Sequence, residues 1–110
     1  MKQMTAIQLK EWLDQARAGE RPAPVLLDVR EPWEFDVVHI SGAKPMPMRA
    51  IPARYPELKR DAETVVICHH GARSYQVAMF LEHQGFENVI NLYGGMAAWS
   101  RDADPSAPTY

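Results

Sequence analysis

The sequence predicts an α/β fold in which helices cover a parallel sheet. Residues 25–27, 65–67 and 89–90 are short apolar runs without polar alternation, as is typical of strands buried on both faces of a parallel sheet. Each run is followed by a loop and then by a segment with helical periodicity, and this alternation favours the α/β class. A length of 110 residues fits one such domain.

The first helix is predicted over residues 6–18. Thr5 and Gln8 have the spacing of a capping box at its start, in which each side chain pairs with an unpaired backbone N–H group. Apolar residues then recur at helical spacing up to Gly19, which provides a stop. Residues 21–24 contain two prolines, so they form a connection to the first strand.

Later elements follow the same reasoning. Pro32 suits the first position of a short helix that carries Trp33. The prolines within residues 43–59 leave room for one short strand and one short helix only. A longer helix is expected over residues 74–84, and a last short helix carries Trp99. We expect both tryptophans to anchor the core.

Composition excludes several functional classes. Lys+Arg 12 against Asp+Glu 14 gives a net charge of −2, so there is no basic excess for coating a nucleic acid. No apolar stretch suits export or a membrane span. The single cysteine, Cys68, cannot form an intramolecular disulfide and indicates a reducing, cytoplasmic setting. Residues 102–110 form a polar tail that we expect to be flexible or to lie on the surface.

The chemistry is expected in the loop that begins at Cys68. A buried strand ends there and a helix begins near Ser74, and in open α/β sheets ligands bind at the carboxyl ends of strands. A short loop that leads into a helix N-terminus turns several backbone N–H groups inward as an anion-binding nest. Gly71 permits the required backbone conformation, and Arg73 adds a fixed positive charge.

A thiol in this setting is expected to ionise readily and to act as a nucleophile. The alternative is that Cys68 is only a small apolar residue that closes a strand. His69 and His70 follow it directly. Because adjacent residues rarely reach one ion and no second ligand pair is present, we predict no metal site.

Asp28 and Arg30 follow the first strand and allow two interpretations. They can form a pair that supports the neighbouring loop, because parallel strands end at the same edge of a sheet. Asp28 can instead cap the helix that begins at Pro32.

Four blocks of the sequence resemble the rhodanese family of sulfurtransferases, in its single-domain form. The blocks are Asp28-Val29-Arg30-Glu31 with Trp33-Glu34-Phe35, His39-Ile40-Ser41-Gly42-Ala43, the loop from Cys68 to Arg73, and residues 88–99. The resemblance implies a rhodanese domain over residues 1–101, with a central, mostly parallel sheet of about five short strands and helices on both faces.

The resemblance also implies an activity, the transfer of a sulfane sulfur. Cys68 attacks thiosulfate or a similar small anionic donor, and the resulting persulfide passes its sulfur to cyanide or a thiol, or to a protein acceptor. No cofactor, nucleic acid or membrane is implied. The donor is bound by the loop residues His69, His70, Gly71, Ala72, Arg73 and Ser74.

Three other functions fit the same resemblance. A related cysteine-based phosphatase or arsenate reductase has one more residue between the cysteine and the arginine, whereas four separate Cys68 from Arg73 here. A noncatalytic binding module usually lacks the cysteine. A persulfide carrier for a protein partner uses the same loop, and the sequence does not separate it from a thiosulfate enzyme.

Overall fold

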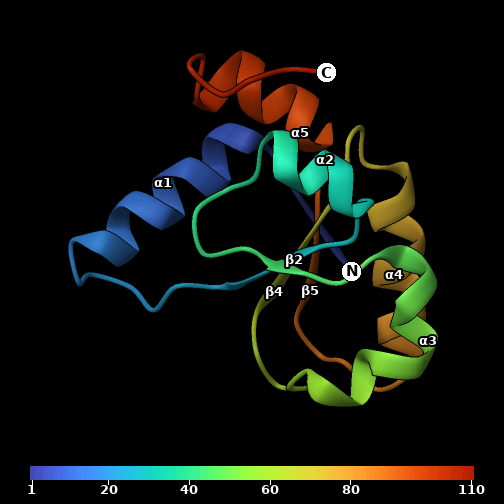
Figure 1. Cartoon of the computed structure of the whole chain (residues 1–110). Helices are drawn as coiled ribbons and strands as arrows, with labels where there is room; N and C mark the ends of the chain where they lie inside the picture. Colours follow the sequence, from blue (N-terminus) through green and yellow to red (C-terminus); the bar gives the residue numbers. More distant parts are fainter.

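The computed structural model describes residues 1–110 and contains one five-stranded sheet with the order β1-β5-β4-β2-β3 (Figure 1). Every neighbouring pair of strands is parallel. The predicted α/β class and parallel sheet are therefore confirmed. The strands are β1 (Lys2–Met4), β2 (Val25–Asp28), β3 (Lys44–Pro45), β4 (Thr64–Ile67) and β5 (Val89–Leu92).

Helices cover both faces of this sheet. Two of them, α3 and α4, lie on one side, and α1 lies on the other with the C-terminal helices (Figure 1). The helices are α1 (Ala6–Arg17), α2 (Pro32–Val37), α3 (Ile51–Arg54), α4 (Ala72–His83) and α5 (Gly95–Ala98). A π-helical turn at Trp99–Ala103 continues α5, and 3-10 turns at Met48–Ala50 and Tyr55–Glu57 flank α3.

The central strand β4 explains why the apolar runs are continuous. Val65 and Ile67 face the core beneath α1, whereas Val66 and Cys68 face the core beneath α4. Both faces are buried, so Val65, Val66 and Ile67 are all apolar, whereas Thr64 at the start of the strand donates its hydroxyl to the Ala62 carbonyl. The same alternation places the thiol on the α4 side of the sheet, at the carboxyl end of β4.

Two local expectations need correction. Strand β1 was not predicted, because Lys2 and Gln3 are polar and exposed. The backbone of β1 pairs with β5, and the Gln3 side chain accepts a hydrogen bond from Asn91 on that strand. Trp33 is 59% exposed and is no core anchor. The buried side chain of α2 is Glu34, because its carboxylate pairs with Arg73. Trp99 is buried as predicted.

The last residues of the chain pack against the domain. Residues 102 and 103 belong to the final helical turn, and Ala107 packs on the core beneath α1. Beyond it, the Tyr110 hydroxyl reaches side chains near the carboxyl end of β2. No helix combines the length and the apolar composition that a membrane span requires.

Candidate active site

The loop between β4 and α4 begins at Cys68, and α4 starts at Ala72, before the expected Ser74. Gly71 precedes the helix with φ +100°, a left-handed conformation that glycine adopts without strain. The loop therefore lies where the sequence places it.

The N-terminus of α5 supports this loop from behind. The Met96 N–H donates to the Cys68 carbonyl at 2.9 Å, and the Ala97 N–H donates to the His69 carbonyl at 3.0 Å. A Cβ on Gly95 would lie 2.4 Å from the Cys68 carbonyl oxygen. The close approach therefore requires glycine at this position and fixes the backbone of the loop.

Cys68 is almost completely buried, at 1% exposure. Its Sγ accepts a hydrogen bond from the Gly71 N–H at 3.0 Å and lies 3.2 Å from the Ser74 hydroxyl oxygen. Ser74 in turn donates to Asn91 Oδ1 on β5, and Asn91 Nδ2 donates to the Gly71 carbonyl. The thiol thus faces the loop's own polar groups, although it packs on an apolar core.

Several other N–H groups of the loop have no acceptor within the chain. They belong to His69, His70, Ala72, Arg73 and Ser74. Backbone donors without a partner at the start of a helix form a natural binding place for an anion. The loop has unused hydrogen-bonding capacity for a negatively charged sulfur or for a small anionic donor.

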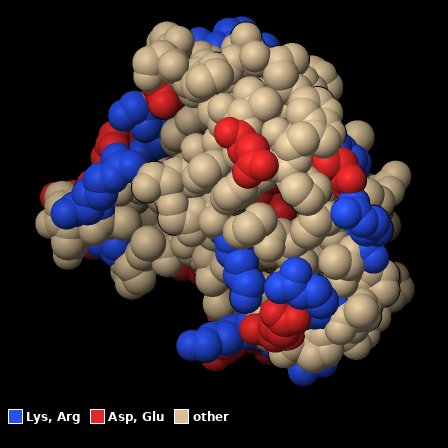
Figure 2. Space-filling model, viewed as in Figure 1, with Lys and Arg blue, Asp and Glu red and all other residues tan.

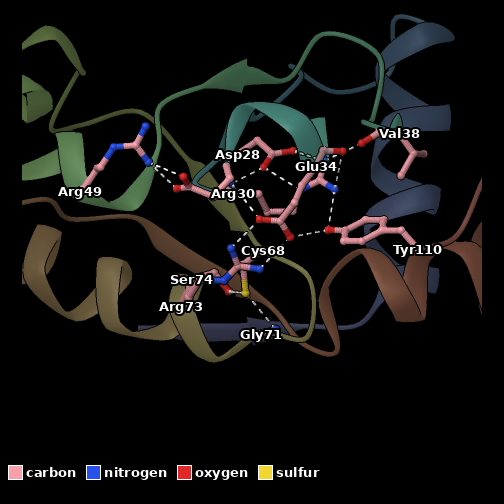
Figure 3. A network of polar contacts seen from close by, with 11 residues as sticks. Asp28, Arg30, Glu34, Val38, Arg49, Cys68, Gly71, Arg73, Ser74 and Tyr110 are labelled. Atoms are coloured by element: carbon pink, nitrogen blue, oxygen red, sulfur yellow. Dashed lines mark hydrogen bonds and ion pairs between the residues drawn. The ribbon is translucent and has the colours of Figure 1, made fainter. Parts of the chain in front are cut away.

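Arg73 points to a carboxylate on α2. Its Nη1 and Nη2 donate to the two oxygens of Glu34 at 2.7 and 2.9 Å (Figure 3). This bidentate pair lowers the pKa of Glu34 from 4.5 to about 2, and Glu34 raises the pKa of Arg73. Both Nη atoms of Arg73 are bound to Glu34, so this side chain links the loop to α2.

Asp28 and Arg30 form a buried pair. Arg30 Nε and Nη2 donate to the two Asp28 oxygens at 2.9 and 2.7 Å, and both side chains are at most 1% exposed. Arg30 Nη2 also donates to the Val38 carbonyl at 2.6 Å. Asp28 does not cap α2; Glu31 occupies that position.

Tyr110 connects these two ion pairs, and sequence reasoning missed it together with Glu34. Its hydroxyl accepts from Arg30 Nη1 at 2.9 Å and donates to Glu34 Oε2 at 2.7 Å (Figure 3). Burial raises the pKa of this hydroxyl to about 12, which keeps it protonated as a donor. The available signal was an aromatic residue in an otherwise polar tail.

Charges elsewhere on this face are mixed. On the face that Figure 2 shows, Lys and Arg are interspersed with Asp and Glu and form no continuous basic surface. No group of three or more His, Cys, Asp or Glu side chains is arranged to hold a metal ion.

A protein-family model described as "Rhodanese-like domain" matches residues 6–102. The chain belongs to the rhodanese-like family. A sulfurtransferase of Allochromatium vinosum is 42% identical over 89 residues, which cover 81% of this chain and 83% of that protein. The thiosulfate sulfurtransferase GlpE of Pseudomonas fluorescens is 38% identical over 86 residues, which cover 78% of this chain and 79% of that protein.

Solved structures agree with the family assignment. The rhodanese-like domain protein from Staphylococcus aureus superposes with a TM-score of 0.82 at 31% identity, over 94% of this chain and 95% of that one. Rhodanese-like domains also occur within longer proteins. The chain spans 30% of the chloroplastic rhodanese-like/PpiC domain-containing protein 12 of Arabidopsis thaliana, with 43% identity over 89 residues, 77% of this chain.

The Glu34–Arg73 pair should contribute to the free energy of unfolding, and this contribution should be lost in acid. The folded-state pKa of Glu34, about 2, lies below its ordinary 4.5, so this component is fully present above about pH 5 and is lost as the pH falls towards 2. At about 1.4 kcal/mol per pKa unit it amounts to about 3 kcal/mol. In urea unfolding, Glu34→Gln should be less stable than the native protein at pH 6, and the gap should close towards pH 2.

An exposed carboxylate serves as the matched control. Glu57 pairs with Arg54 at the surface, so Glu57→Gln should change stability little at any of these pH values. A gap between Glu34→Gln and the native protein that stays constant from pH 6 to pH 2 would contradict the assignment.

Proposed function

We propose that this rhodanese-like protein is a sulfurtransferase that moves a sulfane sulfur from thiosulfate, or a similar anionic donor, to cyanide or a thiol. The carrier is a persulfide on Cys68. The observation that carries the proposal is the surroundings of Sγ, which accepts the Gly71 N–H beside a loop with five further N–H groups that lack an acceptor. A relative named thiosulfate sulfurtransferase supports the choice of donor.

The reaction runs in two half-reactions that balance without another reagent. The Cys68 thiolate attacks the outer sulfur of thiosulfate, the sulfur–sulfur bond of the donor breaks, and sulfite leaves with the bonding electron pair. The acceptor then attacks the outer sulfur of the persulfide, and Cys68 leaves as a thiolate. We assign the stabilisation of negative charge on sulfur, in each state of the reaction, to the loop N–H groups from His69 to Ser74.

The charged residues act on the loop from outside in this proposal. Arg73 contributes its backbone N–H and its positive charge, because its fork is bound to Glu34. Asp28 and Arg30 form the second ion pair of the same hydrogen-bonded network. A tetrahedral phosphate or arsenate is a poorer substrate here, since it requires a wider loop and a free arginine fork. The unpaired thiol fits a reducing compartment, and we propose that the protein acts in the cytoplasm.

Steady-state kinetics test this function. Thiocyanate formation is measured with thiosulfate varied at several fixed cyanide concentrations. Two half-reactions through a covalent intermediate predict parallel double-reciprocal lines. Lines that intersect would exclude the persulfide intermediate. Hydrolysis of an aryl phosphate without thiocyanate formation would favour a phosphatase, and a persulfide that cyanide and small thiols fail to discharge would favour a carrier for a protein partner.

A further inference from the structure

The side chain of Ser74 contacts the reactive sulfur and is completely buried. Its Oγ lies 3.2 Å from Cys68 Sγ (Figure 3). The other hydrogen-bond partner of Sγ is the Gly71 N–H. An N–H group can only donate, whereas a hydroxyl can either donate to the sulfur or accept from it. The direction of the Ser74 hydroxyl therefore decides whether it favours the charged or the neutral sulfur.

Asn91 on β5 fixes that direction. Its amide contacts the Gly71 carbonyl at 3.3 Å and Gln3 Oε1 at 2.9 Å. A backbone carbonyl has no proton to donate, so the Asn91 atom that faces it is Nδ2. Asn91 Oδ1 therefore faces Ser74, and this oxygen can only accept. The Ser74 hydroxyl consequently donates its single proton to Asn91.

Ser74 thus presents a lone pair to the sulfur. A lone pair accepts the S–H of a protonated thiol and repels the negative charge of a thiolate. To donate to the thiolate, Ser74 would have to leave Asn91 Oδ1, which belongs to a side chain that is 2% exposed and has no other donor within the chain. A buried acceptor without a donor is costly, so the hydroxyl stays on Asn91 when Cys68 ionises.

The fixed charges near Sγ occur in ion pairs. Arg73 is close enough that a negative charge on Cys68 contributes to its raised pKa, and Arg73 is bound to Glu34. On the α4 side the sulfur packs on apolar side chains. The other charged or titratable groups near the loop are Asp28, Arg30, His69, His70 and Tyr110. All of them are kept in the variants described below, so differences between these variants report on the Ser74 hydroxyl.

We propose that Ser74 is a catalytic residue that opposes negative charge on Sγ, and that Asn91 is the positioning residue that fixes its hydroxyl. The inference rests on the proposed function. In the first half-reaction Sγ bonds to the outer sulfur of thiosulfate, and sulfite leaves with the electron pair of the broken bond. The negative charge moves in this step from Sγ to the transferred sulfur. Ser74 therefore favours the persulfide over the free thiolate.

Alkylation of the single cysteine tests the direction of the hydroxyl without sulfur transfer. The rate of reaction with iodoacetamide is followed by intact mass across a range of pH in the native protein, Ser74→Ala, Asn91→Leu and the double variant. Loss of the acceptor of the thiol proton should lower the midpoint pH of Ser74→Ala by about half a unit or more. Asn91→Leu frees the hydroxyl to donate to the thiolate, so its midpoint should fall further. The double variant has no hydroxyl and should return to the Ser74→Ala midpoint.

Gln3→Ala is the matched control. It removes one acceptor of Asn91 Nδ2, while the Gly71 carbonyl still fixes the amide, so its midpoint should stay native. A midpoint that is unchanged or higher in Ser74→Ala would overturn the inference.

A second measurement needs no variant. In the native protein, at a pH that protonates Cys68, the Raman S–H stretching band should lie below that of a thiol without an acceptor. A band at the frequency of such a free thiol would also overturn the inference.

Sulfite titration connects the hydroxyl to sulfur transfer. At a fixed thiosulfate concentration, the sulfite concentration that halves the amount of persulfide should be about threefold lower in Ser74→Ala, which corresponds to a shift of about half a pH unit. A native protein that forms no persulfide would overturn the proposed function, and the alkylation midpoints would still decide how Ser74 acts on the thiol. A native protein that forms the persulfide, with an equal sulfite requirement in Ser74→Ala, would contradict this inference alone.

Discussion

Cys68→Ser is expected to abolish sulfur transfer while the domain stays folded. A serine hydroxyl does not ionise at neutral pH and forms no persulfide, so both half-reactions lose their carrier. Thiocyanate formation from thiosulfate and cyanide should fall by about 10⁴-fold or more, as is usual when a covalent nucleophile is removed.

The structure indicates why the fold should survive this change. Serine fills nearly the same volume, and its hydroxyl can accept the Gly71 N–H that now binds Sγ and contact the Ser74 hydroxyl. Circular dichroism and the melting temperature should therefore remain close to native. Turnover near the native rate in a folded Cys68→Ser protein would remove the thiol from the mechanism.

Arg30→Met should cause the largest loss of stability. The Asp28 carboxylate is 1% exposed and has Arg30 as its ionic partner. Methionine would leave that charge buried and uncompensated, at a cost of about 3–5 kcal/mol. Tyr110 and the Val38 carbonyl would also lose a donor. The melting temperature should fall by about 10 °C or more, as differential scanning calorimetry can measure.

The same substitution at the surface provides the control. Arg54 forms a comparable bidentate pair with Glu57, but both side chains are more than 40% exposed. Arg54→Met should therefore leave the melting temperature almost unchanged. In the double variant Asp28→Asn/Arg30→Met the buried charge is gone, so it should be more stable than Arg30→Met alone. Equal losses for Arg30→Met and Arg54→Met would contradict the structural role of the buried pair.

The central strands and the loop that begins at Cys68 were predictable because their signals are local. Three apolar runs, a capping box and the glycine before α4 each depend on residues close together in the sequence. Strand β1 carries no such signal, since Lys2 and Gln3 are polar and their partners on β5 are distant in the sequence. A short edge strand of this kind is identified only once its neighbour is known.

The ion pairs that Tyr110 connects could not be predicted from the sequence, for a different reason. Glu34 and Arg73 are 39 positions apart, and Arg30 and Tyr110 are 80 apart. Only the packed fold brings these groups together. Periodicity also favoured an apolar side chain at the buried position of α2, yet that position holds Glu34 because Arg73 and Tyr110 compensate the burial of its carboxylate. The Glu34 carboxylate sets the direction in which the Arg73 side chain points, and no residue of the loop itself indicates that direction.

The most direct test of this account is the intact mass of the protein after brief exposure to thiosulfate and removal of excess reagent. The native protein should gain the mass of one sulfur atom, cyanide should remove it, and peptide mapping should locate it on Cys68. The Cys68→Ser protein should gain nothing. A native protein that releases no sulfite and keeps its original mass, or one that carries the extra sulfur on any other residue, would contradict the persulfide mechanism.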